Sequence, residues 1–224
     1  FGGDLTGSSM SIGGTTDLDV GGNWEYGSAS FGGDADVMVG GNANVGSLAA
    51  DRNLIAMVGN SFMGTSFDVN NDATVDIGGD WMFETVSVGG LLDATVGGQT
   101  EGNEVSAGTL DLDTGSGLID TLITSDDAVI LSAGDFESTL MDIGNDADIS
   151  VGGNLDVVEL SVGSSFLADI DNAFTFDQLD AGSVEVDAGS INMGKVSTGA
   201  ASFSVGGSIN NNGSSVNASS LSMT

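Results

Sequence analysis

Residues 21–39 read GGNWEYGSASFGGDADVMV, and residues 78–96 read GGDWMFETVSVGGLLDATV. Each stretch consists of a long half of 11 residues and a short half of eight. Each half begins with its own glycine pair. Glycines recur every 19 residues, at Gly2, Gly21, Gly40, Gly59, Gly78 and Gly97. A fixed period of this length predicts a solenoid, in which each repeat forms one turn of a coil.

The short half of each repeat alternates apolar and polar residues. Ala35, Val37 and Val39 therefore share one side of an extended strand, and that side is predicted to face a core. The long half contains two shorter alternating pieces, separated by a break of two residues. In one long half this pattern predicts four inward residues, namely Leu155, Val157, Leu160 and Val162.

These patterns predict an all-β protein, a single-stranded parallel β-helix (β-solenoid) of about twelve coils, each with 17–19 residues and three short strands. One coil cannot bury its apolar side alone, so coils stack at about 4.8 Å to build a shared core. Glycine and asparagine at the corners are expected to supply the positive φ of a sharp turn. We expect residues 1–224 to form one continuous β-solenoid, a mature or partial segment of a longer chain.

The composition excludes several classes of function. The 224 residues carry 33 acidic side chains but only two basic ones, Arg52 and Lys195, for a net charge of −31. Such a chain repels nucleic acid and anionic membranes, and it contains no apolar run long enough for membrane insertion. It also lacks Cys and His, which removes thiol nucleophiles and the usual general base. We expect no catalytic residues and no enzyme activity.

The outward positions of the short halves are rich in carboxylates. Like charges on neighbouring strands repel, so salt, a bound cation or a basic partner is expected to screen them. Oxygen ligands suit Ca²⁺, which makes calcium the candidate ion, although no cofactor is certain. The alternative is a solvated acidic face without discrete sites. The candidate metal ligands form an outward acidic column of Asp36, Asp76, Asp93, Asp111 and Asp148.

Some outward positions carry methionine instead of acid. Met38 and Met57 lie one period apart on the short half, and Met63 and Met82 lie one period apart on the long half. Each pair is expected to stack on the outer surface. Repeated apolar exposure forms a stripe, and such stripes are often contact surfaces. The four residues are candidates for a lateral assembly contact, and isolated surface methionines are the alternative.

The two ends of a solenoid expose unpaired backbone groups, which soluble proteins usually cover with a cap. No cap is visible in GGDLT at one end or in SSLSMT at the other. Two interpretations follow. In the first, the sequence is a slice of a longer solenoid whose caps lie elsewhere. In the second, the first coil of one molecule stacks on the last coil of the next and builds a continuous fibre.

The repeats, with motifs such as VGGNLDV at residues 151–157 and VGGSI at 205–209, resemble filamentous haemagglutinin-like bacterial surface β-solenoids. That resemblance implies secretion and a role in adhesion or matrix. Bactofilins, cytoskeletal β-solenoids that polymerise end to end, are a weaker second resemblance. We expect a secreted structural protein that self-assembles as a homopolymer into an extracellular fibre, sheath or surface layer. The alternative is the shaft or ligand-binding passenger of a large adhesin at the cell surface.

Overall fold

The computed structural model describes residues 1–211 and 215–224. Its regular structure in these residues is entirely β, with no helix, and parallel strands stack as a β-solenoid with about 11 turns. The predicted fold class is therefore confirmed. The chain divides into two compact units, Phe1–Gly115 (unit 1) and Ser116–Thr224 (unit 2). That residues 1–224 form one continuous solenoid stays a prediction.

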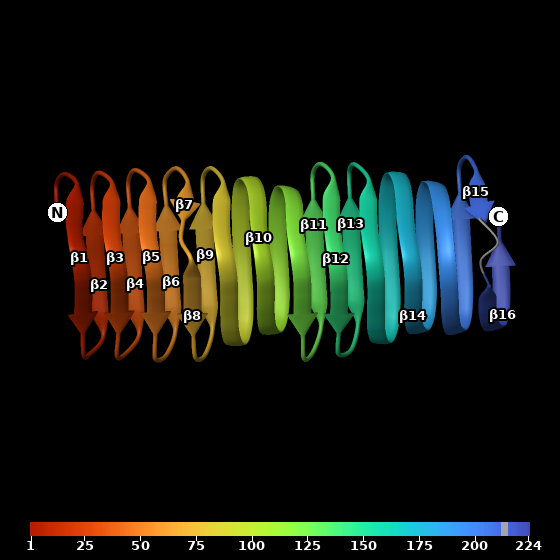
Figure 1. Ribbon diagram of the computed structural model, residues 1–224, viewed down its shortest axis with the longest axis horizontal. Helices are drawn as coiled ribbons and strands as arrows, with labels where there is room; N and C mark the ends of the chain where they lie inside the picture. The colour runs from red at the N-terminus through yellow and green to blue at the C-terminus, as the bar shows by residue number, and fades with distance from the viewer. Residues whose placement is uncertain (212–214) are drawn as a thin grey trace. The chain divides into compact units, whose positions relative to one another are not determined.

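Unit 1 alternates long and short strands along the chain (Figure 1). The long strands are β1 (Leu5–Ile12), β3 (Trp24–Phe31) and β5 (Ala43–Ala50). The short strands are β2 (Thr16–Val20), β4 (Ala35–Val39), β6 (Leu54–Val58) and β9 (Ala73–Ile77). One turn has two pieces in place of the long strand, β7 (Phe62–Met63) and β8 (Ser66–Val69). The continuous strand β10 (Trp81–Thr124) begins in unit 1 and ends in unit 2.

Unit 2 repeats this alternation and then runs into a long continuous strand. Its first elements after β10 are β11 (Ala128–Ser132), β12 (Phe136–Ile143) and β13 (Ala147–Val151). The last elements are β14 (Leu155–Val205), β15 (Ile209–Asn211) and β16 (Val216–Met223). β14 follows the corners without a break in strand geometry, so several turns belong to one strand.

The strand register reproduces the period of the sequence. In unit 1, Leu5 pairs with Trp24, which is a step of 19 residues. In unit 2, Phe136 pairs with Leu155 at the same step, whereas Ile191 pairs with Ile209 after 18. The paired strands keep their alternation of inward and outward residues despite this change in step. The difference in length is therefore taken up at the corners between the strands.

Each eight-residue strand bends in the middle. The pairing of β1 with β3 omits Ser8 and resumes at Ser9, and the buried positions of β3 change parity between Trp24 and Ala29. This bend is the predicted two-residue break, which gives each turn three short inward-facing pieces. The pieces are separate strands in the turn that contains β7, β8 and β9.

Apolar columns fill the interior of each unit. Trp81 packs against Phe62 and Phe67 in unit 1, with ring centroids 6.5 and 5.7 Å apart. In unit 2, Phe174 packs against Phe176 at 4.7 Å. Four inward residues predicted from the long half are all buried, namely Leu155, Val157, Leu160 and Val162. Stacking of large apolar side chains on neighbouring strands is therefore the main stabilising interaction.

Side-chain oxygens join the corners of successive turns. The Oδ1 atom of Asp4 accepts a hydrogen bond from the backbone N–H of Asn23 at 2.8 Å. Asn23 Oδ1 accepts one in turn from the N–H of Asn42 at 2.9 Å. In unit 2 the same contact links Asp135 Oδ1 to the N–H of Asn154 at 2.7 Å. Where an Asp or Asn follows a glycine pair in these examples, its side-chain oxygen thus satisfies a backbone donor of the next turn.

The glycines at these corners have a different role from the predicted one. At the corner glycines Gly21, Gly40, Gly59, Gly78 and Gly97, φ does not lie between +20° and +160°, so the expectation of positive φ is wrong for these glycines. For the corner asparagines it stays a prediction. Their requirement is close approach: a Cβ on Gly40 would lie 2.6 Å from the carbonyl oxygen of Gly21 in the preceding turn. At Gly206, by contrast, a Cβ would meet nothing within 4 Å. Corner glycines therefore let successive turns stack without steric conflict.

Candidate assembly and binding surfaces

Two columns of side chains follow the outward face of the short strands in unit 1. The strand register gives the first column as Asp17, Asp36, Ile55, Thr74 and Asp93. It gives the second as Asp19, Met38, Met57, Asp76 and Thr95. This face therefore mixes carboxylates with exposed apolar side chains and is not one acidic strip.

The structure does not bring the predicted metal ligands together in one column. Asp36 and Asp93 share the first column but are separated by two neutral side chains, and Asp76 belongs to the second column. Asp148 lies in unit 2, where its register partners are Val129 and Leu167. Among the described residues, no group of three or more His, Cys, Asp or Glu side chains is placed to hold a metal ion. Calcium binding stays a prediction.

Two of the predicted ligands, Asp93 and Asp111, do interact electrostatically. Partial burial raises the pKa of Asp111 above its ordinary value, and the negative charges of Asp93 and Asp113 raise it further. The carboxylates therefore repel one another, and charging Asp111 is less favourable in the folded protein than in the unfolded chain.

Both methionine pairs stack as the sequence predicts. Met38 pairs in register with Met57, and Met63 pairs with Met82. Three of the four side chains are strongly exposed, at 43% for Met38, 46% for Met57 and 47% for Met63, and Met82 is half-buried. Their stacking is confirmed, and their role in assembly stays a prediction.

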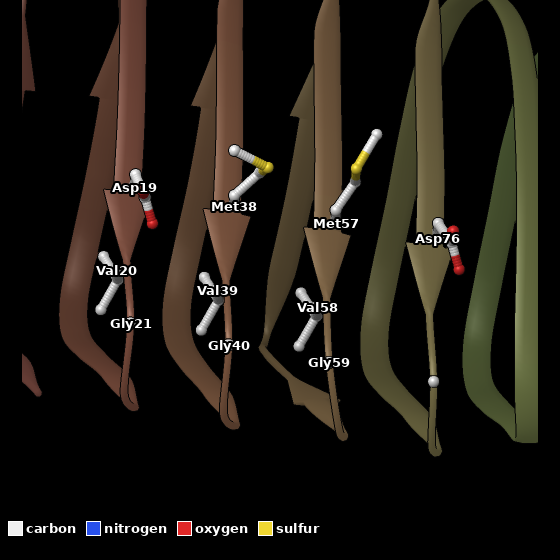
Figure 2. Close-up of a pocket in the computed structure, with 11 residues that line it drawn as sticks. Asp19, Val20, Gly21, Met38, Val39, Gly40, Met57, Val58, Gly59 and Asp76 are labelled. Carbon is white, nitrogen blue, oxygen red and sulfur yellow. The ribbon is translucent and has the colours of Figure 1, made fainter. Parts of the chain in front are cut away.

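A shallow groove of about 410 Å³ follows the second column past Met38 and Met57 (Figure 2). Figure 2 shows the two methionines on adjacent strands, with Asp19 on the strand before them and Asp76 on the strand after. The lower wall consists of corner residues, among them Gly40 and Gly59, whose lack of side chains leaves the groove open.

Unit 1 has one edge that no other described strand of residues 1–224 covers. Within the described part of the chain, β1 pairs only with β3 and β2 pairs only with β4. The inward residues Leu5, Met10 and Ile12 are half-buried, whereas their register partners in β3 are fully buried. Within the described residues the backbone edge is therefore uncovered along β1 and β2, and the end of the core is partly exposed at β1, whereas Leu18 and Val20 of β2 are buried.

A second open edge lies at β16 in unit 2, which pairs only with β14 among the described strands. Leu221 and Met223 stack on the buried residues Ala201 and Phe203, yet they are 49% and 44% exposed. These two apolar side chains belong to core columns, and no further described strand covers them on the side away from β14.

The turns next to β16 have no acidic side chains. Asp187 is the last acidic residue of the sequence, and Lys195 is the only charged side chain after it. Sequence reasoning treated acidity as a property of the whole chain and missed this boundary, although the position of the last Asp or Glu reveals it directly. The β16 edge is thus free of the charge that repels copies elsewhere on the surface.

Comparisons with protein-family models, with curated proteins and with solved structures found no match to this chain. The solenoid architecture is established by the structure, while a relationship to surface adhesins or to bactofilins has no support from these comparisons. No described helix has the length and apolar character needed to span a membrane.

Proposed function

We propose that this protein is a structural β-solenoid that assembles with copies of itself into a fibre, sheath or surface layer outside the cell. The observation that carries this proposal is the pair of strand edges that no other described strand of residues 1–224 covers, at β1 and β2 in unit 1 and at β16 in unit 2. An open parallel edge offers unpaired N–H and C=O groups, which a strand of another molecule can satisfy.

The side chains at the two edges match in character. In this arrangement β15 and β16 of one copy cover β1 and β2 of the next. The exposed Leu221 and Met223 would then lie over the short strand β2, and Val216 over the long strand β1. A head-to-tail contact joins two different surfaces, and where it does not close into a ring it produces an extended polymer. Each junction buries apolar groups and completes a backbone ladder.

Charge favours this end-to-end contact over contact between acidic faces. The net charge of −31 makes copies repel at low ionic strength, and salt screens that repulsion over about 10 Å at 0.1 M. Because the chain after Asp187 has no acid, a junction at β16 brings a nearly neutral surface against β1 and β2. We expect assembly to increase with salt concentration.

Lateral contacts through methionine form a second part of the proposal. Met38 and Met57, with the neighbouring Ile55 at 39% exposure, make an apolar patch on the outer face of unit 1. Patches of this kind on an otherwise acidic surface are suited to pairing between fibres. The proposal gives the chain no catalytic role.

The test is electron microscopy and sedimentation of the 224-residue chain at low and high salt. The variant Met223→Asp places a charge in an inward column of the open edge, and Ser222→Asp adds the same charge at the outward position beside it. We expect fibres for the parent protein and for Ser222→Asp, and dispersed molecules for Met223→Asp. A folded parent protein that stays dispersed at high salt would contradict self-assembly and favour the shaft or passenger of a larger adhesin.

A further inference from the structure

The Met38 and Met57 pair has chemical properties beyond its apolar character. The chain contains no Cys and no His, so methionine sulfur is its only soft metal ligand. Thioether sulfur is selective for soft cations such as Cu(I), whereas carboxylates prefer harder ions. We propose that Met38 and Met57 bind one Cu(I) ion in the groove of unit 1, with a carboxylate of Asp19 or Asp76 as an additional oxygen ligand.

The strand register places the two sulfur atoms within reach of a shared ion. Met38 and Met57 occupy directly paired positions on β4 and β6, and paired residues on neighbouring strands are about 4.8 Å apart. A methionine side chain has three rotatable bonds and adapts readily to such a span. Both side chains lie in the open groove and are about half exposed, so an ion can enter without a change in the core.

Carboxylates flank this pair on both sides. Asp19 pairs with Met38, and Met57 pairs with Asp76, so each sulfur has a carboxylate one strand away (Figure 2). Asp19 and Asp76 are three strands apart, and a single ion therefore contacts one of them at a time. The negative charge of either one neutralises a monovalent cation, and the other raises the local cation concentration.

The second methionine pair differs from the first in its burial and in its neighbour on one side, while Glu101 lies one 19-residue period after Met82 on the other. Met63 also pairs with Met82, but the register partner on its other side is the neutral Asn44, and Met82 is half-buried. The proposal therefore places the ion at Met38 and Met57 and not at every stacked pair.

The experiment is an anaerobic titration of the full chain with Cu(I) in competition with a chromophoric Cu(I) chelator, together with X-ray absorption spectroscopy of the bound metal. The double variant M38L/M57L keeps two apolar side chains of similar size and removes both sulfur atoms. We expect the parent protein to bind one more equivalent of Cu(I) than this variant, with sulfur scattering in its absorption spectrum. We expect M63L/M82L to retain that equivalent, and D19N/D76N to bind it about tenfold more weakly.

Equal Cu(I) binding by the parent protein and M38L/M57L would overturn the proposal. Equal losses in M38L/M57L and M63L/M82L would also overturn it, because they would indicate nonspecific binding to methionine. The site shares Met38 and Met57 with the proposed lateral contact but no residue with the end-to-end contact. M38L/M57L retains the apolar patch and both strand edges, so its assembly in electron microscopy reports on self-association separately from copper binding.

Discussion

The short strand β2 near the start of unit 1 and residues 201–205 near the end of unit 2 share one inward pattern and differ in outward chemistry. β2 reads TDLDV and residues 201–205 read ASFSV. Leu18 in the first and Phe203 in the second are both buried, while the outward positions change from aspartate to serine. The inward columns therefore specify the fold, and the outward positions are free to set charge and association.

The largest expected effect tests whether the inward columns of both units are equivalent. Trp81→Ala in unit 1 and Phe174→Ala in unit 2 each remove a fully buried aromatic side chain. Each should lower the free energy of unfolding by about 3–5 kcal/mol, because the remaining cavity loses its packing contacts. Denaturant titration followed by circular dichroism measures the change. If only one variant lost stability, the packing of inward aromatic side chains would not stabilise both units equally.

A smaller effect is expected at the corners. Gly41→Ala would force a Cβ against the side-chain oxygen of Asn23 and the backbone of Gly22, and should destabilise the fold by about 1–3 kcal/mol. Gly206→Ala is the matched control, because a Cβ there meets nothing within 4 Å. Thermal denaturation of both variants tests this difference. If Gly41→Ala and Gly206→Ala were equally stable, contact between successive turns would not be the reason for glycine at the corners.

Each corner hydrogen bond is expected to contribute less to the stability of the fold than the corner glycine does. Asn23→Ala removes the oxygen that accepts the N–H of Asn42, and Asn154→Ala removes its counterpart for the N–H of Ala173 in unit 2. Each should cost about 1 kcal/mol, the usual net value of one hydrogen bond. The exposed Asn44→Ala serves as the reference and should change stability by less than about 0.5 kcal/mol. Corner variants no less stable than this reference would contradict a role for the ladder.

The smallest effect concerns outward charge. Burial, with Asp93 and Asp113 nearby, raises the pKa of Asp111, so ionising this carboxyl costs stability in the folded state. Asp111→Asn should therefore raise the melting temperature slightly at pH 7. The advantage should shrink as pH falls through the raised pKa and vanish well below the ordinary value of 3.8, where the carboxyl is protonated in both states.

Asp148→Asn is the matched change in unit 2, where the register neighbours of Asp148 are the apolar Val129 and Leu167. It should affect the melting temperature less than Asp111→Asn at pH 7. A larger gain at Asp148 would mean that repulsion between carboxylates does not limit the stability of unit 1.

The sequence predicted the core of this fold well because alternation and period determine which residues face inward. Leu155 and Val157 are buried as expected, and the stacked pair Met38 and Met57 follows directly from the 19-residue step. The acidic column was less predictable. Each short strand has two outward positions that alternation alone cannot distinguish, so Asp36 and Asp76 appeared equivalent. The 19-residue step does distinguish them, because it stacks Asp36 with Ile55 and Thr74, and the prediction of one acidic column did not apply that step.

The corner glycines illustrate a second limit. A glycine in a turn suggests positive φ, but the actual requirement at Gly40 is the approach of the preceding turn. The distance between the corner backbones of two successive turns depends on how the turns stack. The sequence pattern within a single turn does not predict it. The Asp or Asn after several glycine pairs was visible in the sequence, whereas its hydrogen bond to the next turn became clear only from the structure.

The most direct test of self-extension uses disulfide formation between molecules, since the chain has no native cysteine. Met10 lies five residues after Leu5 in the inward pattern of β1, and Val216 pairs with Val196, which lies five residues after Ile191. In the proposed junction Met10 and Val216 are thus stacked neighbours, close enough for a disulfide at strand spacing.

Oxidation of a Met10→Cys/Val216→Cys double variant, followed by non-reducing electrophoresis, measures this contact. We predict a ladder of covalent oligomers that grows with salt, and little product from the control Met10→Cys/Asn217→Cys, whose second cysteine is at the outward neighbouring position. Equal cross-linking of the two variants, or monomers alone in both, would contradict the end-to-end stacking of copies.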